Sequence, residues 1–262
     1  MNPNRGATIV LNWLSRSRAQ RIAWLLEELN LSYTIQPFKR NANGTAPAEM
    51  KQIHPLGKSP TISIQAPDTS LNPIILAETS PIMAYLIEHF ANEEKRNTLV
   101  PEKWIPGKEG MLGGETEEWM RWRYFDSYVE GSLMGTTQVR LVFDAVKNAP
   151  LPFFIKPVTN LITSKVNAEF LDGEFRTHFG FLENQLATPP GGGGYICGRE
   201  LTTADIQLSV PLAVALGLGV VPRGEFPLLN GYVERLQREE GYRRAVERVR
   251  SVEGDGKGFM LE

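Results

Sequence analysis

The chain has 262 residues, enough for one large domain or two small ones, and its 42% hydrophobic and 22% charged residues suit a globular core. A net charge of −2 supplies no overall positive field for nucleic acid or an anionic membrane, so no nucleic-acid partner is expected. One cysteine, Cys197, excludes an internal disulfide framework, and the histidines show no metal-binding spacing, so no metal is expected.

The first part of the chain alternates between strand-like and helix-like patterns. Strands are predicted where β-branched and aromatic residues cluster or alternate, and helices where apolar residues recur at helical spacing. In chain order we expect strand 8–13, helix 18–30, strand 33–38, short helix 46–53, strand 60–64, strand 73–77 and helix 79–90. The order is βαβαββα, and its opening βαβ unit predicts two parallel strands with a right-handed crossover.

The rest of the chain is predicted to be helical. Residues 92–107 are polar and contain prolines, which predicts a linker between a first domain at 1–91 and a second at 108–262. The expected helices are 109–133, 137–148, 153–170, 172–187, 202–218, 227–239 and 241–252. The longest apolar run, 208–221, contains Pro211 and is shorter than the ~20 residues that span a bilayer, which favours a buried core helix.

Four short motifs carry a resemblance to a known family. They are a serine-bearing turn and helix at 17–29, the run HPLGKSPTI at 54–62, the run LAETSPI at 76–82, and the run LTTADI at 201–206. In this order and at these separations they resemble the motifs of glutathione transferases. The second motif, with the segments 37–41 and 128–133, resembles most the yeast-type fungal branch of that family. Thr202 and Asp205 in the last motif also form the pattern of a helix capping box.

The resemblance implies a fold and a catalytic residue. The first domain would be thioredoxin-like and the second all-helical. Ser17 would donate a hydrogen bond to the sulfur of glutathione and favour the thiolate, which is the nucleophile; a free thiol has a pKa near ~8.5. The start of the first helix would favour the same anion. The alternative is that Ser17 only caps this helix, and Ser15 is the neighbouring hydroxyl to compare.

The other motifs would hold the rest of glutathione. By resemblance, a cis Ser59-Pro60 bond would expose the Ser59 backbone to the cysteinyl unit, like an added strand. Lys58 would meet the glycyl carboxylate, the alternative being a solvated lysine. Glu78 would pair with the γ-glutamyl ammonium, and Thr79 with its α-carboxylate, the alternative being a plain helix cap.

A small hydrophobic electrophile would bind where the helical domain faces Ser17. Aromatic side chains of the helix predicted at 109–133 are the candidates for that pocket, with core or dimer packing as the alternative. They are Trp119, Tyr124 and Tyr128, together with Trp122 and Phe125. Arg18 and Arg21 are either electrostatic helpers of Ser17 or ordinary surface arginines. The family resemblance, and the frequency of twofold assemblies, predict a homodimer.

The function implied is conjugation of glutathione, as co-substrate, to electrophiles, as in detoxification, with glutathione-dependent peroxidase activity as a further expectation. A non-enzymatic regulatory or assembly module of the same family is the alternative, and retention of Ser17, Ser59-Pro60 and Glu78-Thr79 together favours the enzyme. A serine hydrolase is excluded because no GxSxG motif occurs.

The N-terminal segment bears on location. Residues 1–6 are polar and lack the apolar core of a secretory signal, which makes the cytoplasm the default location. Peripheral membrane contact stays open, and the resemblance to the fungal branch raises association with the endoplasmic reticulum.

Overall fold

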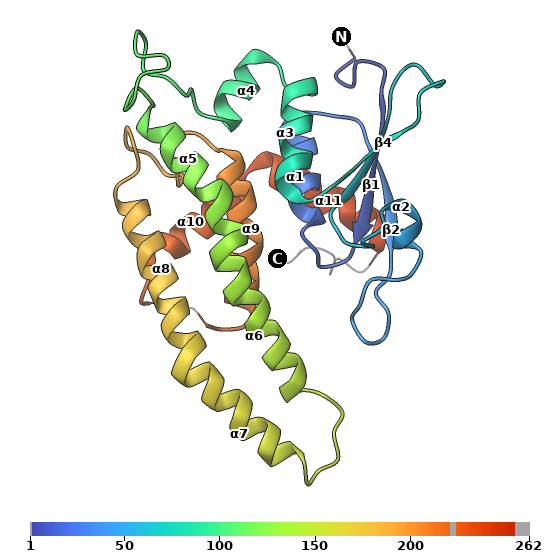
Figure 1. Cartoon of the computed structure of the whole chain (residues 1–262), viewed down its shortest axis with the longest axis vertical. Coiled ribbons are helices and arrows are strands. Elements are labelled where there is room, and N and C mark those ends of the chain that lie inside the picture. Colours follow the sequence, from blue (N-terminus) through green and yellow to red (C-terminus); the bar gives the residue numbers. More distant parts are fainter. Residues whose placement is uncertain (1, 221–223, 255–262) are drawn as a thin grey trace.

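The computed structural model describes residues 2–220 and 224–254. Its first part is a four-stranded sheet, and α1 and α3 cover the face of that sheet turned toward the helical part of the chain (Figure 1). The elements are β1 (Thr8–Leu14), α1 (Ala19–Glu28), β2 (Thr34–Phe38), α2 (Met50–Ile53), β3 (Thr61–Gln65), β4 (Ile74–Ala77) and α3 (Thr79–Phe90). The predicted βαβαββα order is therefore confirmed.

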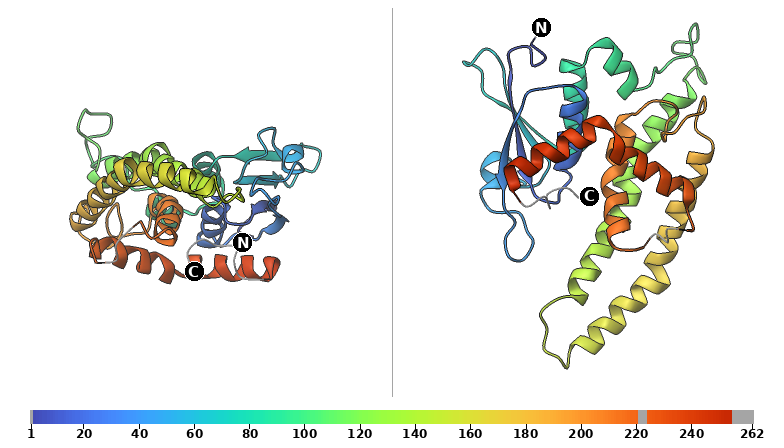
Figure 2. Two further views of the ribbon diagram at one scale, coloured as in Figure 1. Left: turned by 90° about the horizontal axis from the view of Figure 1, so that it is seen from below. Right: turned by 180° about the vertical axis from the view of Figure 1, so that it is seen from behind.

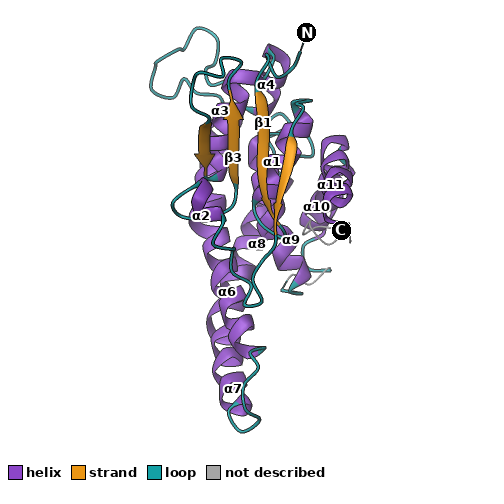
Figure 3. Ribbon diagram, turned by 90° about the vertical axis from the view of Figure 1, so that its right-hand side faces the viewer, coloured by secondary structure: helices purple, strands orange, loops and turns teal. Residues whose placement is uncertain are grey.

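The strand order in the sheet is β2-β1-β3-β4 (Figure 3). β1 and β2 pair in parallel, as the βαβ unit predicts, with Val10 opposite Thr34. β3 runs antiparallel to both of its neighbours, so that Thr61 pairs with Asn12 on one side and with Ala77 on the other. This mixed sheet is the predicted thioredoxin-like fold.

The remaining elements are helices that pack beside the sheet domain. They are α4 (Glu93–Leu99), α5 (Glu117–Tyr128), the π-helical turn η1 (Val129–Leu133), α6 (Met134–Lys147), α7 (Lys156–Val166), a second π-helical turn η2 (Asn167–Leu171), α8 (Asp172–Ala187), α9 (Thr203–Gly217), α10 (Pro227–Arg238) and α11 (Glu240–Glu253). α5, η1 and α6 form one long rod, and α7, η2 and α8 form a second rod beside it (Figure 1). Within 2–220 and 224–254, no helix is long and apolar enough to cross a membrane.

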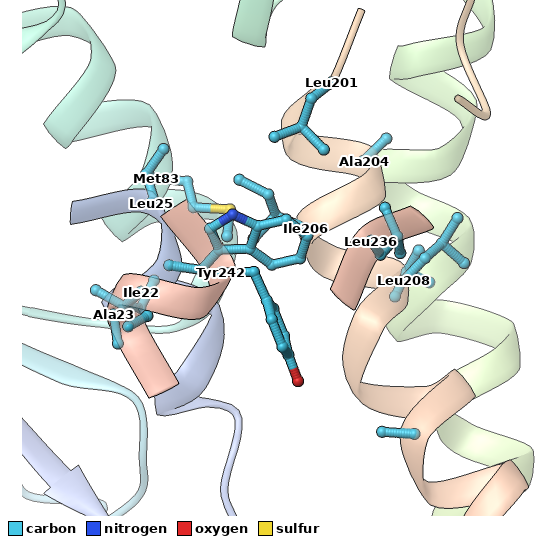
Figure 4. Close-up of a cluster of buried hydrophobic side chains, with 14 of the residues drawn as sticks. Ile22, Ala23, Leu25, Met83, Leu201, Ala204, Ile206, Leu208, Leu236 and Tyr242 are labelled. Carbon is cyan, nitrogen blue, oxygen red and sulfur yellow. The ribbon is translucent and has the colours of Figure 1, made fainter. Parts of the chain in front are cut away.

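Helix α1 joins the two parts of the molecule into one core. Nearly all of its residues from Ala19 to Leu26 are buried, because the sheet covers one side while α9 and α11 cover the others. Ile22 and Leu25 of α1 face Ile206 of α9 and Tyr242 of α11 (Figure 4). Each such side chain contributes about 1.5–3 kcal/mol by leaving water. This packing fixes the start of α1, where Ser17 lies.

Helix α11 returns from the helical part to the sheet domain. Figure 2 shows α10 and α11 crossing the back of the molecule, with α11 lying along α1. The edge of the Trp24 indole of α1 meets the Tyr242 ring at a centroid distance of 5.1 Å. At Gly241 an added Cβ would lie 2.2 Å from a carboxylate oxygen of Glu28, so a larger residue would displace the carboxylate that accepts from the Trp24 indole at 3.0 Å.

Several predicted helix boundaries are wrong, and glycine and capping explain them. The helix predicted to begin at 109 begins at Glu117, because Gly110 and Gly113 adopt left-handed φ angles and Thr116 caps the helix by accepting from the Trp119 N–H at 3.2 Å. The predicted linker 92–107 contains α4, which Asn92 caps by accepting from the Lys95 N–H.

Two predicted breaks between helices are absent. The chain stays helical through Gly135, since burial of Leu133 at the end of η1 and Met134 at the start of α6 outweighs the ~1 kcal/mol that glycine costs in a helix. The second rod likewise continues through residues 170–172, and it begins at Lys156 instead of residue 153. The capping box at Thr202 and Asp205 is confirmed.

A charged cluster lies where α1 meets the long rod. The Arg21 side chain is fully buried, which excludes the surface alternative for this arginine, and it donates to Glu130 of η1. Arg18 donates to the other Glu130 oxygen at 2.5 Å. Burial by itself raises the pKa of the Glu130 carboxyl, but the charges and hydrogen bonds of Arg21 and Arg18 outweigh it and hold that pKa below its ordinary value.

We expect Glu130→Gln to destabilise the protein in a pH-dependent way. A carboxyl with a depressed folded-state pKa contributes stability above its unfolded-state pKa and loses it as pH falls through the folded-state value. Above about pH 5 the substitution should lower the free energy of unfolding by roughly 3 kcal/mol, because a buried arginine is left uncompensated. Below about pH 4 this difference between the two proteins should shrink. Denaturant unfolding of both proteins across this range measures it, and a pH-independent difference would contradict the ion-pair account.

Candidate active site

Three segments meet at one end of the sheet. The register places Thr61, the first residue of β3, beside Asn12 near the end of β1 and opposite Ala77 at the end of β4. The residues just before β3 and just after β1 and β4 therefore lie at the same edge. These are Ser59-Pro60, the turn that contains Ser17, and Glu78-Thr79.

Ser17 lies in the turn from β1 to α1. Its side-chain oxygen accepts from the Ala19 N–H at 3.2 Å and lies 2.9 Å from the hydroxyl oxygen of Ser59. The contact with Ala19 has the form of the helix cap that was the alternative interpretation, but the oxygen also takes part in lining a cavity. Because a hydroxyl can accept and donate at once, its hydrogen is available to Ser59 or to a ligand.

A cavity of about 370 Å³ opens beside Ser17. Its lining includes the predicted residues Ser17, Arg18, Lys58 and Ser59. Arg16 and Arg40 also line it, so four basic side chains surround the cavity, whereas no acidic side chain is among its lining residues. This charge distribution suits an anionic ligand.

The Ser59-Pro60 peptide bond is cis, as the motif predicts. Lys58 is exposed at the cavity, and its backbone carbonyl accepts from the Thr61 hydroxyl at 2.9 Å. Pro60 itself is buried. The motif therefore brings the Ser59 and Lys58 side chains to the same cavity as Ser17.

Glu78 and Thr79 lie at the start of α3, outside the lining of this cavity. Glu78 is exposed and adopts φ of +71°, a left-handed conformation that is unusual for a residue other than glycine. Thr79 is buried, and its hydroxyl accepts from the Arg21 guanidinium at 3.4 Å. Arg16 in the Ser17 turn is also left-handed, at φ of +52°, so two strained residues flank this edge of the sheet.

Comparison with known proteins agrees with the motifs. The family model "Glutathione S-transferase, N-terminal domain" matches residues 16–89, and the model "Glutathione S-transferase, C-terminal domain" matches residues 151–240. The curated protein glutathione S-transferase 1 of Saccharomyces cerevisiae is 32% identical over 93% of this chain and 96% of its own length. The chain belongs to the glutathione S-transferase family. The predicted membership, its fungal type and the predicted enzyme class are thus confirmed at the level of the family.

Other members of the family extend the likeness. Glutathione S-transferase 3 of Schizosaccharomyces pombe is 28% identical, over 79% of this chain and 74% of that protein. The crystal structure of a glutathione S-transferase from Actinobacillus pleuropneumoniae is 27% identical and superimposes with a TM-score of 0.66, covering 92% of both chains. A glutathione transferase from Phanerochaete chrysosporium, solved with oxidized glutathione, shares the fold at 16% identity, with a TM-score of 0.63 over 95% of this chain and 97% of that one.

In this member of the family, apolar residues of two helices line the same cavity as the basic side chains. They are Met134 and Leu141 of α6, and Val210 and Val214 of α9. Sequence reasoning missed them, because only the packing of α6 and α9 against the Ser17 turn brings them together. The apolar run 208–221 was a signal, but it predicts burial without saying what the helix faces.

The aromatic side chains predicted to form the electrophile pocket lie elsewhere. Trp119, Tyr124 and Tyr128 are absent from the lining of the Ser17 cavity. Tyr128 is buried, and its hydroxyl lies 2.7 Å from His178 of α8, while Tyr124 stacks on it at 5.5 Å and is half exposed. The Lys103 ammonium lies over the Trp119 ring at 4.8 Å. In these contacts the three residues pack within the helical part of this family member.

A larger cavity, of about 550 Å³, lies away from Ser17. It is lined mainly by α3 and α5, including Met83, Ile87, Trp122 and Asp126. Judged by volume alone, this cavity would be the candidate active site of this family member. The smaller cavity is the candidate active site, since Ser17, Lys58 and Ser59, which belong to the family motifs, line it.

Ser15, the neighbour compared with Ser17, has a different role in this fold. Its hydroxyl donates to Glu253, the last residue of α11, which also accepts from the Trp13 indole at 2.7 Å. The Arg40 guanidinium donates to the backbone carbonyls of Ser15 and Arg16 at 2.9 and 3.0 Å. Ser15 thus holds the turn that carries Ser17, and Arg40 holds the same turn while lining the cavity.

No group of histidine, cysteine, aspartate and glutamate side chains in the described ranges has the arrangement of a metal site. Cys197, the single cysteine, is buried in the helical part, and burial raises the pKa of its thiol well above the ordinary value.

Proposed function

We propose that this chain activates the thiol of glutathione as a thiolate, with Ser17 as hydrogen-bond donor and the thiol proton leaving to water, and transfers the glutathionyl group to small electrophiles. The observation that carries the proposal is the Ser17 hydroxyl at the wall of a cavity with four basic side chains. Lowering a thiol pKa of ~8.5 by about two units requires roughly 2.7 kcal/mol of preferential stabilisation of the thiolate.

Three features would share that stabilisation. The Ser17 hydroxyl donates to the sulfur, the N-terminus of α1 offers its positive dipole end, and the arginines at positions 16, 18 and 40 add positive charge. The thiolate then attacks the electrophile, a new carbon–sulfur bond forms, and the leaving group departs with its electron pair. In this scheme Ser17 gives up no proton and forms no covalent bond.

Glutathione would lie across the edge where the three segments meet. The Ser59 backbone, beside the cis Pro60, pairs with the cysteinyl unit, and Lys58 meets the glycyl carboxylate. Glu78 takes the γ-glutamyl ammonium, and Thr79 takes its α-carboxylate. The hydrogen bond from the buried Arg21 to the Thr79 hydroxyl supports this assignment, since it adds positive charge near the carboxylate.

For the electrophile we propose the apolar wall formed by α6 and α9. Met134, Leu141, Val210 and Val214 share the cavity with Ser17, whereas the predicted residues Trp119, Tyr124 and Tyr128 do not. A small hydrophobic electrophile would therefore contact aliphatic side chains, and the aromatic cluster would serve packing.

The same thiolate would serve glutathione-dependent peroxidase chemistry, in which two glutathione molecules reduce a hydroperoxide to an alcohol and water and become the disulfide. We also propose a cytoplasmic homodimer with a role in detoxification. The exposed side chains of Met120 and Tyr124 on α5 support a protein contact on that helix.

Turnover of a generic aryl halide with glutathione tests the proposal directly. Conjugation by the purified protein would support the enzyme. Glutathione binding without conjugation of any electrophile would favour the non-enzymatic regulatory or assembly module instead.

The assignment of Glu78 is tested by Glu78→Gln, which removes the charge and keeps the size. Loss of one charge-assisted hydrogen bond at an exposed site should weaken glutathione binding about tenfold, equivalent to about 1.4 kcal/mol. Titration calorimetry measures the affinity, with Glu94→Gln on the exposed face of α4 as control. Equal affinity in wild type and Glu78→Gln would remove Glu78 from the binding site.

A further inference from the structure

The hairpin formed by α6, α7 and the loop 148–155 between them carries an unusual concentration of exposed apolar side chains. Of the twenty large hydrophobic side chains exposed in the described residues, ten lie between residues 139 and 162. They are Val139, Leu141, Val142, Val146, Phe153, Phe154, Ile155, Val158, Leu161 and Ile162. Single exposed apolar residues are ordinary, but a contiguous set marks an interaction surface.

The most exposed of these residues, Phe153, is in the loop at the tip of the hairpin. Phe153 is 85% exposed and its neighbour Phe154 is 67% exposed, and their rings meet edge to face at 5.6 Å. The hairpin projects beyond the rest of the molecule in Figures 1 and 3, and the loop that carries both phenylalanines is at its far end. Two adjacent phenylalanines directed into water contribute little to the core, and as part of a contiguous apolar set they mark an interaction surface.

The charge of the hairpin indicates what it meets. Residues 145–168 contain Lys147, Lys156 and Lys165 and no acidic residue, although the whole chain has a net charge of −2. Lys165, the farthest of the three from Phe153 along the chain, pairs with Glu169 at 3.8 Å. Each of these lysines is exposed. A projecting tip of aromatic and aliphatic side chains with basic residues around it complements an anionic lipid surface, where rings enter the headgroup region and lysines stay at the phosphates.

We propose that the α6–α7 hairpin docks on anionic phospholipid bilayers, with Phe153 and Phe154 inserted among the headgroups. The contact is peripheral, in keeping with the absence of a spanning helix in the described residues. The proposal goes beyond the proposed function and does not depend on it, since neither phenylalanine lines the Ser17 cavity.

The position of the hairpin links this surface to the cavity. Leu141 lines the Ser17 cavity and is itself exposed, and it lies six residues before the end of α6. Six residues of helix span about 9 Å. An inserted tip that enters about 5–10 Å into the interface would therefore bring the cavity mouth close to the headgroups, where apolar electrophiles concentrate.

The test is co-sedimentation of the full chain with vesicles of phosphatidylcholine alone or mixed with phosphatidylserine. We expect binding to the mixed vesicles that weakens with salt, and a loss of at least tenfold in Phe153→Ser/Phe154→Ser. The matched control is Met111→Ser/Leu112→Ser, which alters another adjacent exposed apolar pair, in the loop before α5, and should bind like the wild type. Lys147→Gln/Lys156→Gln, which retains both phenylalanines, should bind the mixed vesicles no better than vesicles of phosphatidylcholine alone.

Three results would overturn the proposal. The first is no binding of the wild type to either kind of vesicle. The second is an equal loss of vesicle binding in the hairpin variant and the control variant. The third is a lower molar mass in light scattering for Phe153→Ser/Phe154→Ser than for the wild type, with no vesicle binding by either protein. The last would make the hairpin a contact between copies of the chain. Conjugation of a water-soluble electrophile should be the same in all variants, so a failure of lipid binding is distinguishable from a failure of the thiolate proposal.

Discussion

Ser17→Ala should lower the turnover of an aryl halide by up to about 25-fold at pH 7, which is the fall in thiolate fraction when the pKa of the bound thiol returns from about 6.5 to ~8.5. The Ser17 oxygen is the hydroxyl that lies in the cavity at the start of α1, and no other side chain of that turn replaces it, because the Ser15 hydroxyl is directed to Glu253. Without the donor, the pKa of the bound thiol rises and less thiolate is present at pH 7.

The pH dependence separates this effect from a loss of folding or binding. At high pH the bound thiol ionises in both proteins, so the difference in turnover should narrow to less than about tenfold near pH 9. Ser59→Ala removes the hydroxyl that faces Ser17 at 2.9 Å but leaves the donor in place, and it should retain most of the activity. A deficit in turnover that stays constant from pH 6 to pH 9 would argue against thiolate stabilisation by Ser17.

Asp205→Ala should destabilise the protein by about 4 kcal/mol, because it strands several buried donors at about 1–3 kcal/mol each. Asp205 is fully buried at the start of α9. One carboxylate oxygen accepts from the Ile196 N–H at 2.9 Å and the Tyr232 hydroxyl at 2.7 Å. The other accepts from the Thr202 N–H at 2.8 Å and the Thr202 hydroxyl at 2.7 Å. The hydroxyls can rotate to other acceptors, but the backbone N–H groups cannot.

Thermal unfolding measures this effect, and a loss of that size lowers Tm by roughly 10 °C in a chain of this length. The matched control is Asp172→Ala on the exposed start of α8, where a single ion pair to Arg140 should be worth less than about 1 kcal/mol. Equal Tm values for the two variants would contradict a stabilising role for the buried carboxylate network.

Much of this fold follows from local patterns in the sequence. The βαβ order, the strands and α3 were predictable because the apolar periodicity agrees there with the turn and capping residues. The motif around Ser59-Pro60 was specific enough to predict the cis bond that the structure has. The capping box at Thr202 was also local, since its two residues lie three apart. The motifs likewise predicted Ser17, Lys58 and Ser59, which share one cavity.

Contacts between distant segments were beyond prediction from periodicity. Glu253 reaches Ser15 across 238 residues, and Arg40 reaches it across 25. Arg21 has the sequence signature of a surface arginine on a helix, and only the approach of η1 buries it against Glu130. For the same reason the α6 and α9 residues of the cavity wall were missed. The aromatic residues of α5 were predicted to line the pocket on the basis of residue type alone.

Titration of the thiol of bound glutathione, followed by the ultraviolet absorbance of its thiolate in wild type and Ser17→Ala, measures the central claim most directly. We expect the wild-type midpoint to lie about two units below the ~8.5 of a free thiol, and the variant midpoint to return at least halfway toward that value. Coincident midpoints in the two proteins, with glutathione bound to both, would show that the Ser17 hydroxyl does not stabilise the thiolate.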